Sequence, residues 1–90
     1  MASLQVKWIV PDGTDPDRRI DAIGGDNFCH RINEAILNIN NGVHSYWTIV
    51  DGRAVSVLVA IRNGRYYIRT ETDYFEPNNL LNLPHRRWAA

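Results

Sequence analysis

Residues 31–42, with the sequence RINEAILNINNG, decide the fold of this chain. Four apolar residues in this stretch have the i, i+3, i+4 and i+7 spacing that lines one face of a helix: Ile32, Ala35, Ile36 and Ile39. Asn41 and Gly42 follow, and both tolerate the left-handed backbone conformation that ends many helices. No other stretch has a convincing helical pattern. Because the apolar stripe of this helix needs a sheet to cover, we predict an α+β fold.

The residues before the helix predict two strands. In the first strand, alternate apolar residues share one face: Leu4, Val6, Trp8 and Val10. This alternation places Trp8 in the core. Residues 11–17 break the strand because they combine Pro, Gly and turn-forming Asp. A short second strand is expected over residues 18–23, followed by a turn in which Asp26 or Asn27 caps the approach to the helix.

Three further strands are expected after the helix, over His44–Val50, Arg53–Arg62 and Arg65–Glu71. Asp51-Gly52 and Asn63-Gly64 separate them, and both pairs are favoured in two-residue hairpin turns. The whole pattern predicts a single small domain. It contains an antiparallel sheet of about five strands in the order strand, strand, helix, strand, strand, strand, and the helix packs on one face of the sheet.

Length and composition set the remaining expectations for the chain as a whole. Ninety residues provide one small core, which we expect to cover about residues 4–84, with residues 85–90 as a frayed end. Ten basic and ten acidic side chains balance, which argues against non-specific binding to nucleic acid or to a membrane surface. No apolar run approaches the ~20 residues of a membrane span, and no signal peptide is recognisable. Together with the single cysteine, these features predict a cytoplasmic protein.

Several segments taken together resemble a known sequence pattern. They are RRIDAIGG at residues 18–25, EAI at 34–36, YIRT at 67–70 and NNLLNLP at 78–84. The chain is similar to a family of small, mostly bacterial domains of unknown function, whose signature runs from Arg-Ile-Asp-x-Ile-Gly-Gly to Asn-Asn-Leu-Leu-x-Leu-Pro. The resemblance covers roughly residues 6–84 and implies no activity, substrate or cofactor. Some relatives carry a cysteine directly after the Leu-Pro, where this chain has His85.

One candidate interaction surface is the open face of the expected sheet. Tyr67 alternates with Arg65 and Arg69 on the last strand, and Trp47 lies on a neighbouring strand. Basic residues interleaved with aromatic ones can stack single-stranded bases. The alternative is that these side chains form cross-strand pairs and occupy positions that strands favour in any case. We favour this second interpretation.

The second candidate is the segment that follows the last strand. Asn78 and Asn79 can hydrogen-bond the edge of the sheet while Leu80, Leu81 and Leu83 pack on the core and lock the tail in place. Alternatively, the same leucines fill a groove on a second copy or on a partner. We favour the lock.

The sequence offers no catalytic, cofactor or metal set. Cys29 and His30 are adjacent and point in different directions, and His44 and His85 lack the close spacing of a zinc site. We therefore predict a non-enzymatic module that binds a protein partner or a second copy of itself. Single-stranded nucleic-acid binding through Trp47, Arg65, Tyr67 and Arg69 is the alternative, and a hydrolase based on Cys29 with His30 or His85 ranks below both.

Overall fold

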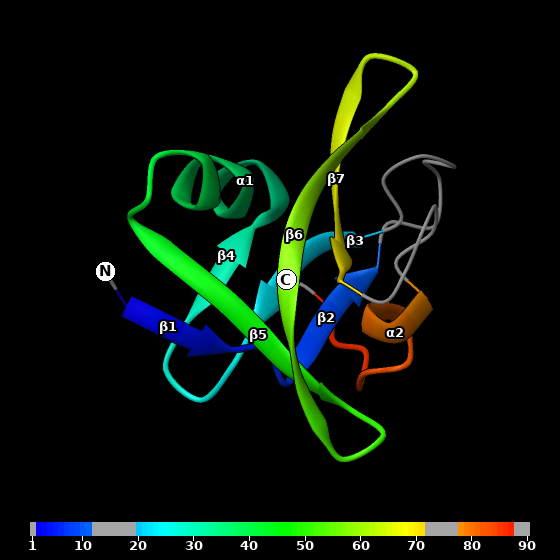
Figure 1. Cartoon of the computed structure of the whole chain (residues 1–90). Coiled ribbons are helices and arrows are strands. Elements are labelled where there is room, and N and C mark those ends of the chain that lie inside the picture. Colours follow the sequence, from blue (N-terminus) through cyan, green and yellow to red (C-terminus); the bar gives the residue numbers. More distant parts are fainter. Residues whose placement is uncertain (1, 12–19, 72–77, 88–90) are drawn as a thin grey trace.

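The predicted helix and the three strands after it form at the residues that the sequence pattern indicates. The computed structural model describes residues 2–11, 20–71 and 78–87 (Figure 1). In chain order, the elements within these ranges are β1 (Ala2–Gln5), β2 (Trp8–Pro11), β3 (Ile20–Gly24), β4 (Cys29–Arg31), α1 (Ile32–Asn40), β5 (His44–Val50), β6 (Arg53–Arg62), β7 (Arg65–Thr70) and α2 (Asn78–Leu81).

The strands form two sheets, whereas the sequence predicted one antiparallel sheet of about five strands. The first sheet has the order β1-β5-β6-β7, and the second has the order β2-β3-β4. β1 runs parallel to β5, and the remaining pairs are antiparallel. The chain is thus a small, predominantly β domain with one substantial helix, and the coarse α+β assignment holds.

The first predicted strand is divided because the chain crosses from one sheet to the other at Val6 and Lys7. The Val6 amide donates to the Trp47 carbonyl on β5 at 2.7 Å, and the next amide, Lys7, donates to the Gly24 carbonyl on β3 at 2.8 Å. The buried Thr48 hydroxyl donates to the Val6 carbonyl at 3.0 Å. The crossing therefore has its own hydrogen bonds, and they join the two sheets.

This crossing changes which side chains point inward. Ile9 is fully buried, whereas Trp8 is half-buried, so the expectation that Trp8 belongs to the core was wrong. The Trp8 indole lies directly against Gly24, where an added Cβ would overlap the ring, and its Nε1 donates to the Gly25 carbonyl at 3.2 Å. The Arg86 guanidinium covers the ring, 4.7 Å from its centroid.

β4 was not predicted. It pairs with β3 in the register Ala22↔Arg31 and Gly24↔Cys29, and the helix begins directly after it. Asp26 and Asn27 lie in the tight connection between β3 and β4 rather than at the start of the helix, where Arg31 is the N-cap residue of α1 and makes no side-chain cap hydrogen bond. A strand of three residues is too short to show a periodicity, so the sequence carried little signal for it.

The two predicted hairpin turns are confirmed. Asp51 and Gly52 have φ of 51° and 79°, and Asn63 and Gly64 have φ of 53° and 76°. Positive φ at both central residues is the requirement of the type I′ turn. The second turn sets the β6–β7 register, in which Arg62 pairs with Arg65.

The core lies between the two sheets and is enclosed by both helices. α1 contacts β3 and β4 of one sheet and β5, β6 and β7 of the other, whereas α2 contacts β2 and β7. Figure 1 shows the two helices on opposite sides of the sheets. The buried cluster draws on every layer and contains Val6, Ile9, Ile20, Ile23, Ile32, Ala35, Ile36, Tyr46, Val57, Ile68 and Leu80.

Backbone pairing continues past residue 84, where the sequence predicted the start of a frayed end. The Ile9 amide donates to the Pro84 carbonyl at 2.9 Å, and the Arg86 amide donates to the Ile9 carbonyl at 2.7 Å. Ile9 and His85 thereby form an isolated parallel bridge. This short pairing adds the residues after α2 to the edge of β2.

Candidate binding groove

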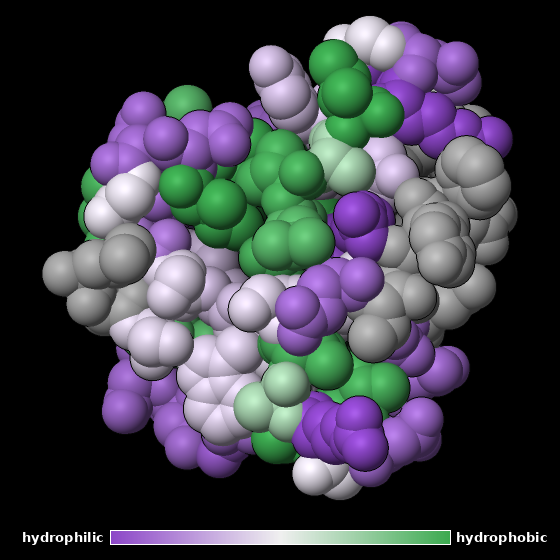
Figure 2. Space-filling model, viewed as in Figure 1, coloured by the Kyte–Doolittle hydropathy of each residue, from purple (hydrophilic) through white to green (hydrophobic). Residues whose placement is uncertain are grey.

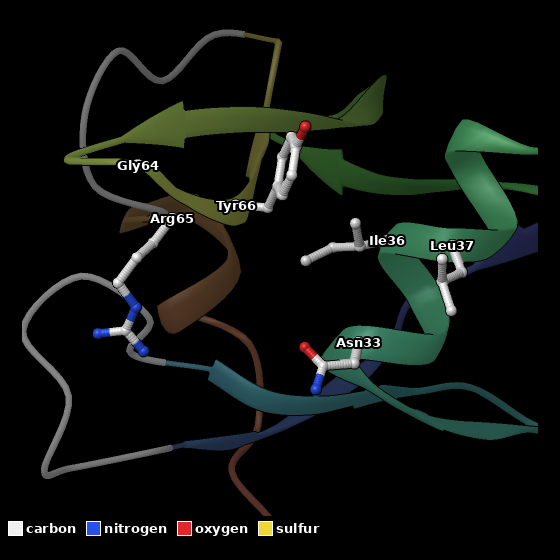
Figure 3. Close-up of a pocket in the computed structure, with 6 residues that line it drawn as sticks. All are labelled: Asn33, Ile36, Leu37, Gly64, Arg65 and Tyr66. Carbon is white, nitrogen blue, oxygen red and sulfur yellow. The ribbon is translucent and has the colours of Figure 1, made fainter.

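A groove of about 450 Å³ lies between α1 and the turn end of the β6–β7 hairpin. Six residues line it: Asn33, Ile36, Leu37, Gly64, Arg65 and Tyr66. Figure 3 shows Ile36 and Leu37 projecting from the helix on one side of the groove and Tyr66 projecting from β7 on the other. The groove is open to solvent, and its volume falls in the range of roughly 300–1,000 Å³ that is typical of ligand sites.

The helix supplies its side of the groove through ordinary helical spacing. Asn33, Ile36 and Leu37 are three and four residues apart, so they are neighbours on the helix surface. Ile36 belongs to the apolar stripe and is only 6% exposed, whereas Leu37 lies outside the stripe and is 59% exposed. The groove therefore adjoins the core at Ile36 and opens to solvent at Leu37.

The β6–β7 hairpin supplies the opposite side of the groove through Gly64, Arg65 and Tyr66. Its turn end extends beyond the rest of the molecule (Figure 1). Ile61 and Tyr66 pair across the two strands near the Asn63-Gly64 turn, and they are 61% and 52% exposed. Tyr66 of this pair lines the groove, and Ile61 lies next to it on the neighbouring strand.

The described residues contain five exposed large hydrophobic side chains, and two of them, Leu37 and Tyr66, line this groove. A third, Ile61, is the cross-strand partner of Tyr66, whereas Val43 and Ile49 do not line the groove. Figure 2 shows hydrophobic surface gathered between α1 and the β6–β7 hairpin. Single exposed apolar residues are common on folded proteins, whereas a cluster of them indicates an interaction surface.

The polar side chains of the groove belong to Asn33, Arg65 and Tyr66, and Arg65 is the charged one among them. Arg65 lines one end, and no acidic residue is among the six lining residues. Arg62 lies directly opposite Arg65 in the β-ladder, so two like charges share the turn end of the hairpin. Both residues interact within the chain.

The predicted aromatic and basic sheet face is not an exposed stacking surface. Tyr67 is only 5% exposed, so it does not offer its ring to solvent as the less favoured stacking interpretation required. Arg69 is half-buried and donates to the Thr70 carbonyl at 3.0 Å. Trp47 is half-buried on β5, which β6 separates from β7. Arg65 is the residue of this predicted set that lines the groove.

The second predicted set, at residues 78–84, makes the contacts of a lock. Asn78 begins α2, and the Asn79 side-chain amide donates to the Thr70 hydroxyl at 3.0 Å. Leu80 is fully buried, and Leu81 and Leu83 pack against the core cluster. These leucines cover the domain's own core, which matches the interpretation that the sequence analysis favoured.

A polar network beneath α1 is the other notable cluster. The Asn38 amide donates to the Tyr46 hydroxyl at 2.9 Å, and His30 Nδ1 lies 2.8 Å from the same hydroxyl. Burial raises the pKa of Tyr46, with a further upward contribution from Glu34, while the hydrogen bond from Asn38 opposes the rise. The His44 ring stacks on His30, and its buried Nδ1 has no hydrogen-bond partner among the described residues. These contacts connect β4, β5 and α1.

The described residues do not bring a cysteine–histidine catalytic set together. Cys29 is exposed on β4, where partial desolvation raises the pKa of its thiol and so disfavours the reactive thiolate. His30 Nδ1 is engaged with Tyr46. His85 is hydrogen-bonded to the Leu81 carbonyl at 2.7 Å and bridges β2, at the opposite edge of the sheet from β4.

In residues 2–11, 20–71 and 78–87, no three His, Cys, Asp or Glu side chains are placed to hold a metal ion. Within the same ranges, neither helix has the length and apolar character needed to cross a membrane.

Sequence reasoning missed most of the groove. Asn33, Leu37 and Tyr66 received no functional assignment from the sequence. The available signals were Leu37 outside the apolar stripe and an apolar pair, Ile61 and Tyr66, beside the Asn63-Gly64 turn. The approach of α1 to the hairpin depends on the packing of both sheets and has no local signature.

Comparison with known proteins places the chain in a family without identifying an activity. Searches of curated proteins and of solved structures gave no match. A family model described as "Protein of unknown function (DUF3892)" matches residues 6–84, which include β2 to β7, both helices and the whole groove, but not β1. The protein therefore belongs to the DUF3892 family, whose function is unknown.

Proposed function

We propose that this domain is a protein-interaction module whose groove between α1 and the β6–β7 hairpin binds an apolar side chain of a partner polypeptide. The observation that carries the proposal is the position of Leu37, Ile61 and Tyr66. These three side chains are each more than half exposed; Leu37 and Tyr66 line one groove of about 450 Å³, and Ile61 lies opposite Tyr66 across the hairpin.

The physical basis is the removal of apolar surface from water. Burial stabilises a complex by about 25 cal/mol per Å² of apolar surface, so one aliphatic anchor contributes about 1.5–3 kcal/mol. Tyrosine is enriched among the residues that dominate interface energies, and Tyr66 forms one wall of the groove. A site built on one anchor and its rim supports weak, reversible binding, in the range of about 1 μM to 1 mM.

The test is a selection from a random twelve-residue peptide library displayed on phage, with the whole folded protein as the target. We expect enriched peptides that share an aliphatic or aromatic residue. The double variant Leu37→Ser/Tyr66→Ser should lose them, because it removes the apolar walls. Ile49→Ser is the matched control, since Ile49 is 45% exposed but does not line the groove. Circular dichroism should show that both variants remain folded.

Two outcomes would contradict the proposal. One is the absence of enriched peptides, and the other is enrichment of peptides that the Leu37→Ser/Tyr66→Ser variant binds as well as the parent. Sedimentation velocity of the protein alone provides a separate check on the occupant. A dimer that dissociates in the double variant, but not in Ile49→Ser, would replace the partner polypeptide with a second copy of this chain.

A further inference from the structure

We infer that the groove binds its partner segment in an extended conformation, as a short added strand that pairs with the outer edge of β7 at Tyr66. This inference rests on the proposed function and adds the conformation and the backbone contacts of the partner. β7 is the last strand in the order β1-β5-β6-β7, so no described strand pairs with its outer edge. Such an edge presents backbone N–H and C=O groups that can pair with another chain.

The register of the β6–β7 hairpin shows which peptide groups of β7 point outward. The two residues that flank the two-residue turn form a hydrogen-bonded pair. Hydrogen-bonded and non-hydrogen-bonded pairs alternate along an antiparallel ladder, so the next pair, Ile61 and Tyr66, is not hydrogen-bonded. Glu71, an odd number of residues further along, follows this alternation, because its amide donates to the Ser56 carbonyl at 2.9 Å. The N–H and C=O of Tyr66 therefore point away from β6.

The outward-facing peptide groups of Tyr66 lie beside the groove. Tyr66 is 52% exposed, and within the described residues no backbone hydrogen bond to a turn, a loop or another element involves it. Gly64, Arg65 and Tyr66 all line the groove, whereas no residue of β6 does. Successive side chains of a strand point to opposite faces, and Figure 3 shows Arg65 and Tyr66 pointing in opposite directions. A groove lined by both residues therefore passes along the edge of β7.

β2 of the same molecule shows how one residue at a sheet edge binds an extended segment. The Ile9 amide donates to the Pro84 carbonyl at 2.9 Å, and the Arg86 amide donates to the Ile9 carbonyl at 2.7 Å. His85 thereby lies opposite Ile9 in a parallel bridge. Tyr66 presents the same two groups, one N–H and one C=O, at the edge of β7.

This pairing also determines where the apolar anchor of the partner lies. Paired residues of neighbouring strands share a face, so the partner residue opposite Tyr66 projects from the same face as Tyr66. Ile68, two residues further along β7, uses this face to pack in the core cluster that contains Ile36 of α1. The anchor therefore enters the groove between the Tyr66 ring and the helix. In this binding mode the backbone bonds provide affinity, and the pocket for one side chain provides specificity.

The test is an N-methyl scan of one synthetic peptide from the displayed library, with binding to the whole protein measured by fluorescence anisotropy. Each peptide variant replaces one backbone N–H with N–CH₃. In an added strand, alternate N–H groups point toward β7. Methylation of the N–H that pairs with the Tyr66 carbonyl should weaken binding about 10-fold or more, because it removes a hydrogen bond and leaves its acceptor buried. Methylation of the residue directly before or after it should have little effect.

Amide hydrogen exchange of the protein provides a second measurement. The Tyr66 amide should exchange rapidly in the free protein and slowly with the unmethylated peptide bound, because it then donates to a peptide carbonyl. The Tyr67 amide is the matched control. Tyr67 pairs with Ala60 in the hydrogen-bonded phase of the ladder, so its amide should be protected before the peptide is added.

The outcomes separate this inference from the proposed function. A peptide that depends on Leu37 and Tyr66 but tolerates methylation at every position would overturn the inference and leave the proposed function standing. Loss of binding at several consecutive positions would also overturn it, because a helical segment needs all of its N–H groups. The same holds for a bound peptide that leaves Tyr66 exchange unchanged. A failure to obtain any groove-dependent peptide would overturn both.

Discussion

Tyr46 occupies the junction of β4, β5 and α1 through a single hydroxyl. The phenol is 2% exposed and accepts a hydrogen bond from Asn38. The same hydroxyl can donate its own proton to His30 Nδ1, so that it accepts one hydrogen bond and donates another. Ionisation would remove this proton and place a negative charge in the core, which is why burial raises the pKa.

We therefore expect Tyr46 to ionise above 10.0, its value when unperturbed. Because the folded-state pKa exceeds that of the unfolded chain, this group's contribution to stability is complete below pH 10 and is lost as the pH rises through the folded-state pKa. The difference between the 295 nm absorbance titrations of the parent and of Tyr46→Phe isolates this one phenol. A difference curve centred at or below pH 10 would contradict the expected burial.

At the scale of elements, α2 shows how a segment of four residues can close the core. Leu80 is fully buried between β2 and β7, and Asn79 ties the helix to Thr70 at the end of β7. The residues that follow then pair with β2. An isolated four-residue helix has no stability of its own in water, so these tertiary contacts maintain it.

Replacing Leu80 with Ala should lower the free energy of unfolding by about 2–5 kcal/mol, because it removes buried methyl groups and leaves a cavity. Urea denaturation followed by circular dichroism measures this change. For the same reason we expect a chain that ends at residue 76 to be unfolded.

Leu37→Ala is the matched control for this experiment, since it makes the same chemical change at a position that is 59% exposed. It should alter stability by only about 0.5 kcal/mol. If the two variants lost equal stability, or if the truncated chain remained folded and monomeric, the segment would not be a lock.

The sequence predicted those helices and strands whose residue patterns lie within the element itself. The apolar stripe gave α1, and alternation bounded by Asp-Gly and Asn-Gly gave β5 and β6 with the observed ends and β7 within one residue. The division of β1 from β2 was missed because Leu4, Val6, Trp8 and Val10 alternate without a break. The crossing at Val6 is decided by the carbonyls of Trp47 and Gly24, which are distant in sequence.

At the scale of the whole molecule, the groove was also missed because it depends on contacts between residues that are distant in sequence. Alternation correctly placed Tyr67 on the strand face opposite Ile68, yet it could not show that Tyr67 is buried. The groove forms where α1 and the turn end of the β6–β7 hairpin, which are separate segments of the chain, lie next to one another. Arg65 was identified as a candidate from the sequence, but its neighbours in the groove depend on how the two sheets pack.

The central claim is that the groove beside α1 binds an aliphatic side chain, and amide chemical-shift mapping tests it most directly. The measurement is a titration of the uniformly ¹⁵N-labelled protein with N-acetyl-leucine, which carries both an aliphatic side chain and a carboxylate. We predict saturable shifts confined to residues 33–37 and 61–66, and their loss in Leu37→Ser/Tyr66→Ser. Shifts centred on Trp47 and Ile49 of β5, or shifts that do not saturate at any residue, would contradict the claim.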